Sequence, residues 1–128
     1  MRINDPAVLA EMEEAFSRYE TALVTNDVTV LDELFWQSEH TVRYGGGENL
    51  YGIEEIQAFR NARPSQGLER TLERTVITTY GRDFATASTL FRRDTAPGKV
   101  GRQMQSWIRT PDGWRVVAAH VSVIADPG

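Results

Sequence analysis

The sequence predicts a single α+β domain over residues 1–128, with three helices in its first half packed on a curved, mostly antiparallel sheet. Before residue 64 apolar residues recur at helical spacing, whereas after residue 70 runs of β-forming residues alternate with turn residues. Long strands joined in sequence by tight turns indicate an antiparallel sheet, and helices grouped early indicate α+β. A length of 128 residues fits one domain.

Three segments have the pattern of helices. A capping side chain followed by proline at residues 4–6 is typical of a helix start. Residues 26–27 end this first helix and cap a short second helix at 28–35. A third helix is expected at about 53–62, with Pro64 just beyond its end. The apolar positions of the first helix are Val8, Met12, Ala15, Phe16, Tyr19 and Leu23.

The remaining segments have the pattern of strands. Three consecutive glycines at 45–47 must end the first strand, and a further short strand before the third helix is left open. Pro111-Asp112-Gly113 is a strong hairpin signal before the last strand. Both faces of that last strand are mostly apolar, so we expect it to be covered on both sides. The strands are expected at 40–44, 71–80, 84–93, 101–110 and 114–124.

Composition excludes several classes of function. The absence of cysteine excludes disulfides, thiolate metal sites and cysteine nucleophiles. A net charge of −4 argues against a nucleic-acid partner. No apolar run is long enough for a membrane span, and the N-terminus has no apolar signal core, so a cytoplasmic location is expected. With two histidines and no recognisable ligand spacing we expect no metal and no cofactor, and hence acid–base or electrostatic chemistry.

Tyr19 and Arg43 are polar residues in apolar surroundings. Tyr19 shares a helix face with core residues, and this spacing alone favours a core tyrosine whose hydroxyl meets a backbone carbonyl. Alternation in the strand at 40–44 favours Val42 and Tyr44 facing the core and Arg43 facing water. If the faces are reversed, a buried Arg43 requires an anion, from the protein or from a ligand.

Further candidates lie on the third helix and the last two strands. Alternation puts His120 and Ser122 on one face of the last strand as polar groups in an apolar setting, for which a core role and a site role are equally supported. Gln105 or its neighbour Ser106 lines a pocket, depending on which face is inward. Arg60 and Arg63, near the helix end, are expected to be solvated from their position alone. Of 14 basic residues 13 are arginine, a bias that suits carboxylate binding but also follows from genome composition.

The ending Gly-Trp-Arg at 113–115, followed by Ala-Ala-His-Val-Ser at 118–122, resembles the NTF2-like (SnoaL-like, ketosteroid-isomerase-like) superfamily. A narrower resemblance, to the AtzH-like family that includes the HpxZ proteins of oxalurate catabolism, covers nearly the whole chain. It is carried by Thr-Val-Arg-Tyr-Gly at 41–45, by Gly-Ile-Glu-Glu-Ile at 52–56, and by Gly-Arg-Gln at 101–103 with Gln-Ser-Trp at 105–107.

The resemblance implies a cone-shaped roll, usually a homodimer. It also implies a decarboxylating amidohydrolase that converts 1,3-dicarboxyurea, a small anionic ureide, to allophanate in cyanuric acid catabolism, with no cofactor. The family's proposed catalytic pair matches Tyr19 as general acid and Arg43 as the group that holds a carboxylate or carbonyl oxygen. Binding of the rest of the substrate is expected from the following side chains, with Arg102 as a further candidate cation: Arg63, Gln105, Trp107, His120 and Ser122.

Two other hypotheses remain. In the first hypothesis, the chain is a non-catalytic NTF2-like module that binds a small anion, or associates with an amidase, in oxalurate or purine catabolism. Proton transfer of the ketosteroid-isomerase type is less favoured, because it needs a carboxylate base in the cavity. No Asp or Glu lies on a clear inward face of the expected strands.

Overall fold

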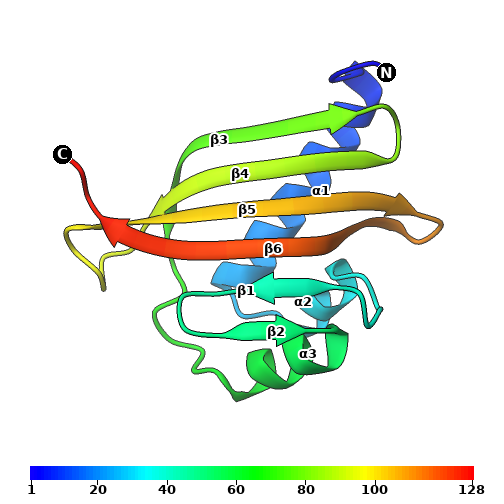
Figure 1. The fold of residues 1–128 in the computed structure, drawn as a ribbon. Helices are drawn as coiled ribbons and strands as arrows, with labels where there is room; N and C mark the ends of the chain where they lie inside the picture. The colour runs from blue at the N-terminus through cyan, green and yellow to red at the C-terminus, as the bar shows by residue number, and fades with distance from the viewer.

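The computed structural model describes residues 1–128 and places three helices against one face of a six-stranded sheet (Figure 1). This confirms the predicted α+β class. The helices are α1 (Pro6–Val24), α2 (Val28–Leu34) and α3 (Ile53–Ala62). The strands are β1 (Val42–Tyr44), β2 (Asn49–Tyr51), β3 (Thr71–Tyr80), β4 (Phe84–Arg92), β5 (Lys99–Thr110) and β6 (Gly113–Ala125).

The sheet has the order β2-β1-β6-β5-β4-β3. All neighbouring strands are antiparallel except β1 and β6, which pair in parallel. The long α1 crosses behind the four long strands, and α2 and α3 lie below it near the short strands (Figure 1). The short strand that the sequence left open is β2, which pairs with β1 across the three-glycine turn. We call the sheet face that carries the helices the inner face.

Local signals position the helices as predicted. The Asp5 carboxylate accepts hydrogen bonds from the backbone N–H groups of Ala7 and Val8, at 3.1 and 3.4 Å. Asp27 does the same for Val30, at 3.2 Å. Side-chain acceptors at these positions satisfy amides that have no partner in the first turn of a helix. His40, which was expected to be part of the first strand, lies before it and is exposed.

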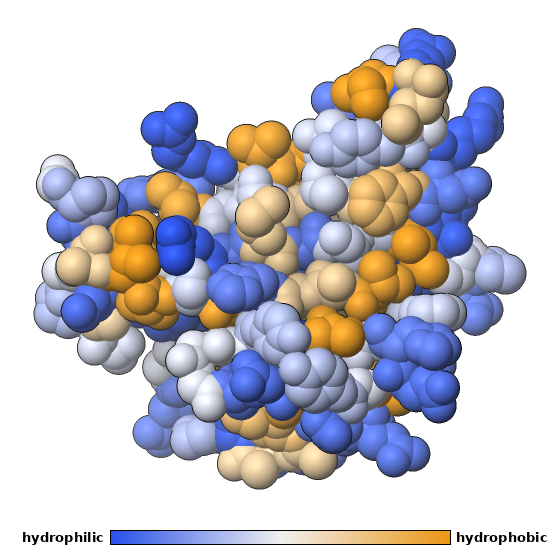
Figure 2. Space-filling model, viewed as in Figure 1, coloured by the Kyte–Doolittle hydropathy of each residue, from blue (hydrophilic) through white to orange (hydrophobic).

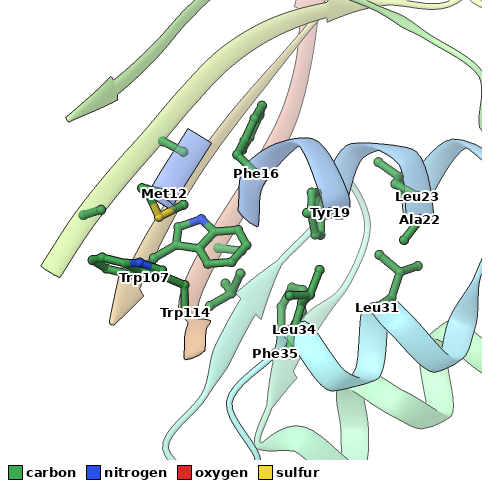
Figure 3. Packing of buried hydrophobic residues seen from close by; sticks show 14 of the residues in the cluster. Met12, Phe16, Tyr19, Ala22, Leu23, Leu31, Leu34, Phe35, Trp107 and Trp114 are labelled. Atoms are coloured by element: carbon green, nitrogen blue, oxygen red, sulfur yellow. The ribbon is translucent and has the colours of Figure 1, made fainter. Parts of the chain in front are cut away.

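The core fills the space between the helices and the inner face (Figure 3). Residues of α1 at helical spacing meet Leu34 and Phe35, at the end of α2. From the sheet, Trp107 and Trp114 enter the same cluster, with exposed fractions of 0% and 6%. Both tryptophans are therefore core residues. The α1 side chains in this cluster are Val8, Met12, Phe16, Tyr19, Ala22 and Leu23.

A β-bulge in β6 changes which residues face inward. Ser106 pairs with Ala118, but the next residue of β5, Trp107, pairs with Val116, so Val117 is the extra residue. Before the bulge Val116 is buried, and after it Ala119 is buried. An extra residue shifts the alternation by one position. The uninterrupted alternation expected over 114–124 is therefore wrong.

The outer face of the sheet is open to solvent. It exposes apolar side chains of three strands, Val76, Phe84 and Met104, with exposed fractions of 56%, 38% and 60%. Figure 2 views this face and shows hydrophobic and hydrophilic side chains mixed across it. In β6 itself Ala118 and His120 are exposed on this face, so the expectation that this strand is covered on both faces is wrong. None of the helices combines the length and apolar character that a membrane span needs.

Candidate active site

Tyr19 lies on the inward face of α1, at the centre of an aromatic cluster. Its ring is 6.2 Å from Phe35 and 6.2 Å from Trp107, which it meets edge-on, and 6.5 Å from Phe16. Figure 3 shows it beneath α1, directed towards Phe35. The residue is 5% exposed. The helical spacing of the apolar residues in α1 therefore predicted the orientation of this ring.

The hydroxyl of Tyr19 has no hydrogen-bond partner within the protein. Its oxygen is nevertheless not among the buried polar atoms that lack a partner, so it keeps some access to solvent. A core tyrosine would normally have its hydroxyl paired, because an unpaired buried hydroxyl is costly. Spacing alone predicted that this hydroxyl donates a hydrogen bond to a backbone carbonyl, and that prediction is wrong. An accessible, unpaired hydroxyl at the end of a buried ring is instead free to meet a ligand.

Arg43 faces inward, contrary to what strand alternation alone favoured. In the sheet it pairs with Leu50 of β2 and Ala119 of β6, both of which are buried on the inner face. Its Nη1 donates to a Glu48 carboxylate oxygen at 2.8 Å. Its guanidinium carbon lies 5.7 Å from the ring centre of Phe59, on α3. The inward and outward faces of β1 are the opposite of those predicted, because the parallel pairing with β6 determines the register of this short strand.

Two other inner arginines have carboxylate partners. Arg60, at the end of α3, donates to Asp32 at 2.6 Å and is only 4% exposed. The prediction that Arg60 is solvated is therefore wrong, because its guanidinium group pairs with a carboxylate on α2. Arg70 forms a two-point contact with Glu20, with distances of 2.9 and 2.6 Å. Such paired geometry compensates much of the cost of burying the charge.

Arg63 and Arg93 are half-buried and have no carboxylate partner within ion-pair distance. Arg63 donates only to the Asn26 side chain, at 3.4 Å, and the Nε atom of each arginine is buried without a partner. Burial lowers the pKa of both guanidinium groups. Neighbouring cations lower it further, Arg60 at Arg63 and Arg70 at Arg93, whereas Glu20 raises it at Arg93 and Tyr19 raises it at both. These two cations therefore lie in the electrostatic surroundings of the phenol, and neither has a carboxylate of its own within ion-pair distance.

Two glutamines and a tryptophan of β5 share the inner face. Gln105 is buried and accepts a hydrogen bond from the Trp107 indole N–H at 3.0 Å. Gln103 is also buried and accepts from Arg70 at 3.1 Å, while its own Nε2 donors have no partner. The structure thus places two of the residues expected to bind substrate, Gln105 and Trp107, on the same side of the sheet as Tyr19. Ser106 faces outward.

His120 and Ser122 are not brought together with Tyr19. The bulge in β6 turns both to the outer face, where His120 is exposed and stands edge-on to Tyr44 at 6.3 Å. Ser122 accepts a hydrogen bond from Arg102 at 3.1 Å on that same face. The prediction that His120 and Ser122 bind substrate beside the phenol, with Arg102 as a second cation, is therefore wrong, because all three side chains lie on the outer face.

Sequence reasoning missed Arg93 and Gln103. Both continue the inward alternation of a strand, Gln103 within β5 and Arg93 one residue beyond the end of β4, which was a usable signal. Buried Phe91 precedes Arg93 by two positions, and Gln103 precedes Gln105 by two. Their residue types nevertheless favour exposure, because arginine and glutamine side chains are most often solvated.

Comparison with known proteins supplies the family. A model described as AtzH-like matches residues 1–127. The chain belongs to the AtzH-like family. A solved protein of unknown function from Pectobacterium atrosepticum is 64% identical, with 96% of this chain and 95% of that chain covered and a TM-score of 0.94. A cystatin-like fold protein from Burkholderia xenovorans is 50% identical, with 99% of both chains covered and a TM-score of 0.95.

A more distant structure connects this AtzH-like protein to its superfamily. An NTF2-like superfamily protein from Salmonella enterica is 27% identical over 95% of this chain and 94% of that one, with a TM-score of 0.74. The predicted NTF2-like fold is therefore confirmed. Among curated proteins no relative is found. The AtzH-like site accordingly has to be interpreted from its own chemistry.

Proposed function

We propose that this protein is a decarboxylating amidohydrolase that removes one carboxylate from 1,3-dicarboxyurea and leaves allophanate. The activity is the one that the AtzH-like resemblance implies, and the observation that carries it is the unpaired, accessible hydroxyl of Tyr19. The reaction needs a proton donor at nitrogen and a cation at a carboxylate. Both kinds of group lie on the inner face.

The proposed reaction breaks the bond between a urea nitrogen and its carboxylate carbon. Carbon dioxide leaves, the bonding electron pair stays on nitrogen, and the Tyr19 hydroxyl donates its proton there. The tyrosinate then takes a proton from water, which restores the phenol. General-acid catalysis of this kind contributes a rate factor of about 10²–10⁴. A hydroxyl that is already engaged by the protein would be a poorer donor, so the lack of a partner supports this role.

Arg43 is the proposed cation at the reacting end of the substrate. Glu48 accepts from Nη1 alone, and none of the other donors of this guanidinium makes a hydrogen bond within the protein. A guanidinium has five N–H groups, so donors remain for a carboxylate or carbonyl oxygen. Glu48 also limits how far the side chain can swing. The positive charge would stabilise the tyrosinate that forms transiently.

The aromatic cluster supplies the low-dielectric surroundings that this chemistry favours. Phe16, Phe35 and Trp107 enclose the phenol ring and exclude water from all but its hydroxyl end. Attraction between charges strengthens where water is excluded. Gln105 is fixed by the Trp107 indole, so it offers a positioned amide for the urea core.

A second candidate function is anion binding without turnover. The observation that favours it is the pair of half-buried arginines, Arg63 and Arg93, which would attract an anion whether or not Tyr19 acts. On this hypothesis the protein binds the ureide and passes it to, or shields it for, a partner amidase. The phenol of Tyr19 is then dispensable.

The test is release of carbon dioxide from freshly made 1,3-dicarboxyurea, with allophanate followed in parallel. We expect a rate above the spontaneous background that falls by about 10²-fold or more in Tyr19→Phe and in Arg43→Gln. Matched controls are Tyr51→Phe and Arg82→Gln, which alter exposed residues away from the inner face. Wild-type release at the background rate would contradict the proposal, and so would an unchanged rate in Tyr19→Phe.

A further inference from the structure

The inner face holds more positive charge than the protein itself neutralises. Arg60 and Arg70 each have their own carboxylate, as does Arg43. Arg63 and Arg93 have none, although both are half-buried and each has a buried Nε with no hydrogen-bond partner. Partly desolvated charge is costly unless it is paired. A ligand carboxylate placed between these two cations would neutralise part of this excess charge.

Gln103 adds a neutral donor whose direction is fixed. Arg70 can only donate, so the Gln103 atom that it meets at 3.1 Å must be the amide oxygen. Arg70 is itself fixed by its two-point contact with Glu20, and its side chain is 1% exposed. The amide nitrogen of Gln103 therefore points away from Arg70. It is buried and unpaired in a residue that is 2% exposed.

Arg93 is held in place by Phe91. The guanidinium carbon of Arg93 lies 4.8 Å from the centre of that ring, and the guanidinium carbon of Arg70 lies 4.6 Å from it. The ring in turn packs on Gly101, where a Cβ would lie 2.1 Å from a ring carbon. Stacking on an aromatic ring satisfies a guanidinium in part and leaves its in-plane N–H groups free for a carboxylate.

There is space beside Arg93 for a carboxylate group. A small cavity of about 40 Å³ is lined by Arg93 with Phe91, Ala96, Gly101 and Val123, whereas Arg63 and Gln103 lie outside this lining. A second cation, Lys99, also lines it, and no acidic residue does. That volume holds about three waters, or one carboxylate, and is too small for a whole ureide.

We propose that Arg63, Arg93 and Gln103 form a second carboxylate site, which makes the protein selective for ureides that carry a carboxylate at both ends. The inference rests on the proposed function, because it assigns the end of the substrate that does not react. It explains why the reaction would stop at allophanate. The product has a single carboxylate, so it leaves either this second site or the Arg43 end empty and binds more weakly than the substrate.

The test measures binding and needs no turnover. Glutarate has the same spacing between its carboxylates as 1,3-dicarboxyurea and does not react, and pentanoate matches it with one carboxylate replaced by a methyl group. By calorimetric titration of the purified protein, we expect glutarate to bind about tenfold or more tightly than pentanoate. In Arg93→Gln and in Arg63→Gln this preference should fall to about threefold or less, with pentanoate affinity nearly unchanged.

Controls separate this inference from the proposed function. Arg82→Gln, at an exposed turn, should keep the wild-type preference for glutarate. Thermal denaturation checks that both arginine variants remain folded, and any loss should be small because neither arginine has a carboxylate partner. Equal binding of the two acids by the wild type would overturn the inference, as would an undiminished preference in both arginine variants. A preference that depends on these arginines, without any release of carbon dioxide, would uphold the second site and refute the catalytic proposal.

Discussion

Replacement of Tyr19 by phenylalanine should separate a catalytic hydroxyl from a structural one. A buried hydroxyl that makes a hydrogen bond contributes about 1 kcal/mol to the free energy of unfolding. The Tyr19 hydroxyl makes none, and the ring contacts with Phe35 and Trp107 do not involve the oxygen. Tyr19→Phe should therefore change the free energy of unfolding by less than about 0.5 kcal/mol. The rate of decarboxylation should nevertheless fall by about 10²–10⁴.

The assay is urea unfolding and carbon dioxide release on the same preparations. Thr41→Val shows that the unfolding measurement is sensitive enough. The Thr41 hydroxyl is fully buried and donates to the Trp36 carbonyl at 2.8 Å, so its loss should cost about 1–2 kcal/mol. In a chain of this size 1 kcal/mol corresponds to a shift of about 3–5 °C in Tm.

The opposite pattern would refute the reasoning. If Tyr19→Phe lost 1 kcal/mol or more and kept full activity, the hydroxyl would be a structural group with an unrecognised partner. The aromatic cluster around it would then be core and nothing else.

Two further predictions concern packing and pH. Gly101→Ala should displace the Phe91 ring and lower the free energy of unfolding in urea by about 1–3 kcal/mol. Gly46→Ala is the control and should be neutral, because no atom lies within 4 Å of the added Cβ. Equal stability of the two variants would contradict this prediction. The Arg92 guanidinium donates to Asp126 at 2.6 Å and holds the pKa of that carboxyl below 3.8. Its contribution to stability is thus present above about pH 3.8 and is lost progressively as the pH falls below that. Wild type and Asp126→Asn should therefore differ in urea unfolding at about pH 5, and the difference should shrink as the pH is lowered below about 3.8. A difference that persisted unchanged at the lower pH would count against this assignment.

Elements with local signals were predictable from the sequence. The third helix, Ile53–Ala62, and the strand Thr71–Tyr80 have the predicted bounds, because their periodicity and flanking turn residues lie within a few positions. The inward face of Tyr19 followed from spacing on one helix. In each case the information is in neighbouring residues.

The rest of the site depends on contacts between distant segments. Arg43 faces inward because β1 pairs with β6, about 75 residues later in the chain. His120 faces outward because of one extra residue at Val117, which alternation alone does not reveal. Arg60 is buried because Asp32 of another helix meets it. Polar residues on the inner face are thus placed by partners that no local pattern identifies.

Catalytic turnover is the central claim, and a time course of freshly made 1,3-dicarboxyurea by carbon-13 NMR tests it most directly. The protein is added at a small fraction of the substrate concentration, at two levels. Catalysis predicts that allophanate forms faster than in buffer, at a rate proportional to the protein added, and that the reaction stops at allophanate. Formation at the buffer rate, or slower because the ureide is merely bound, would contradict it.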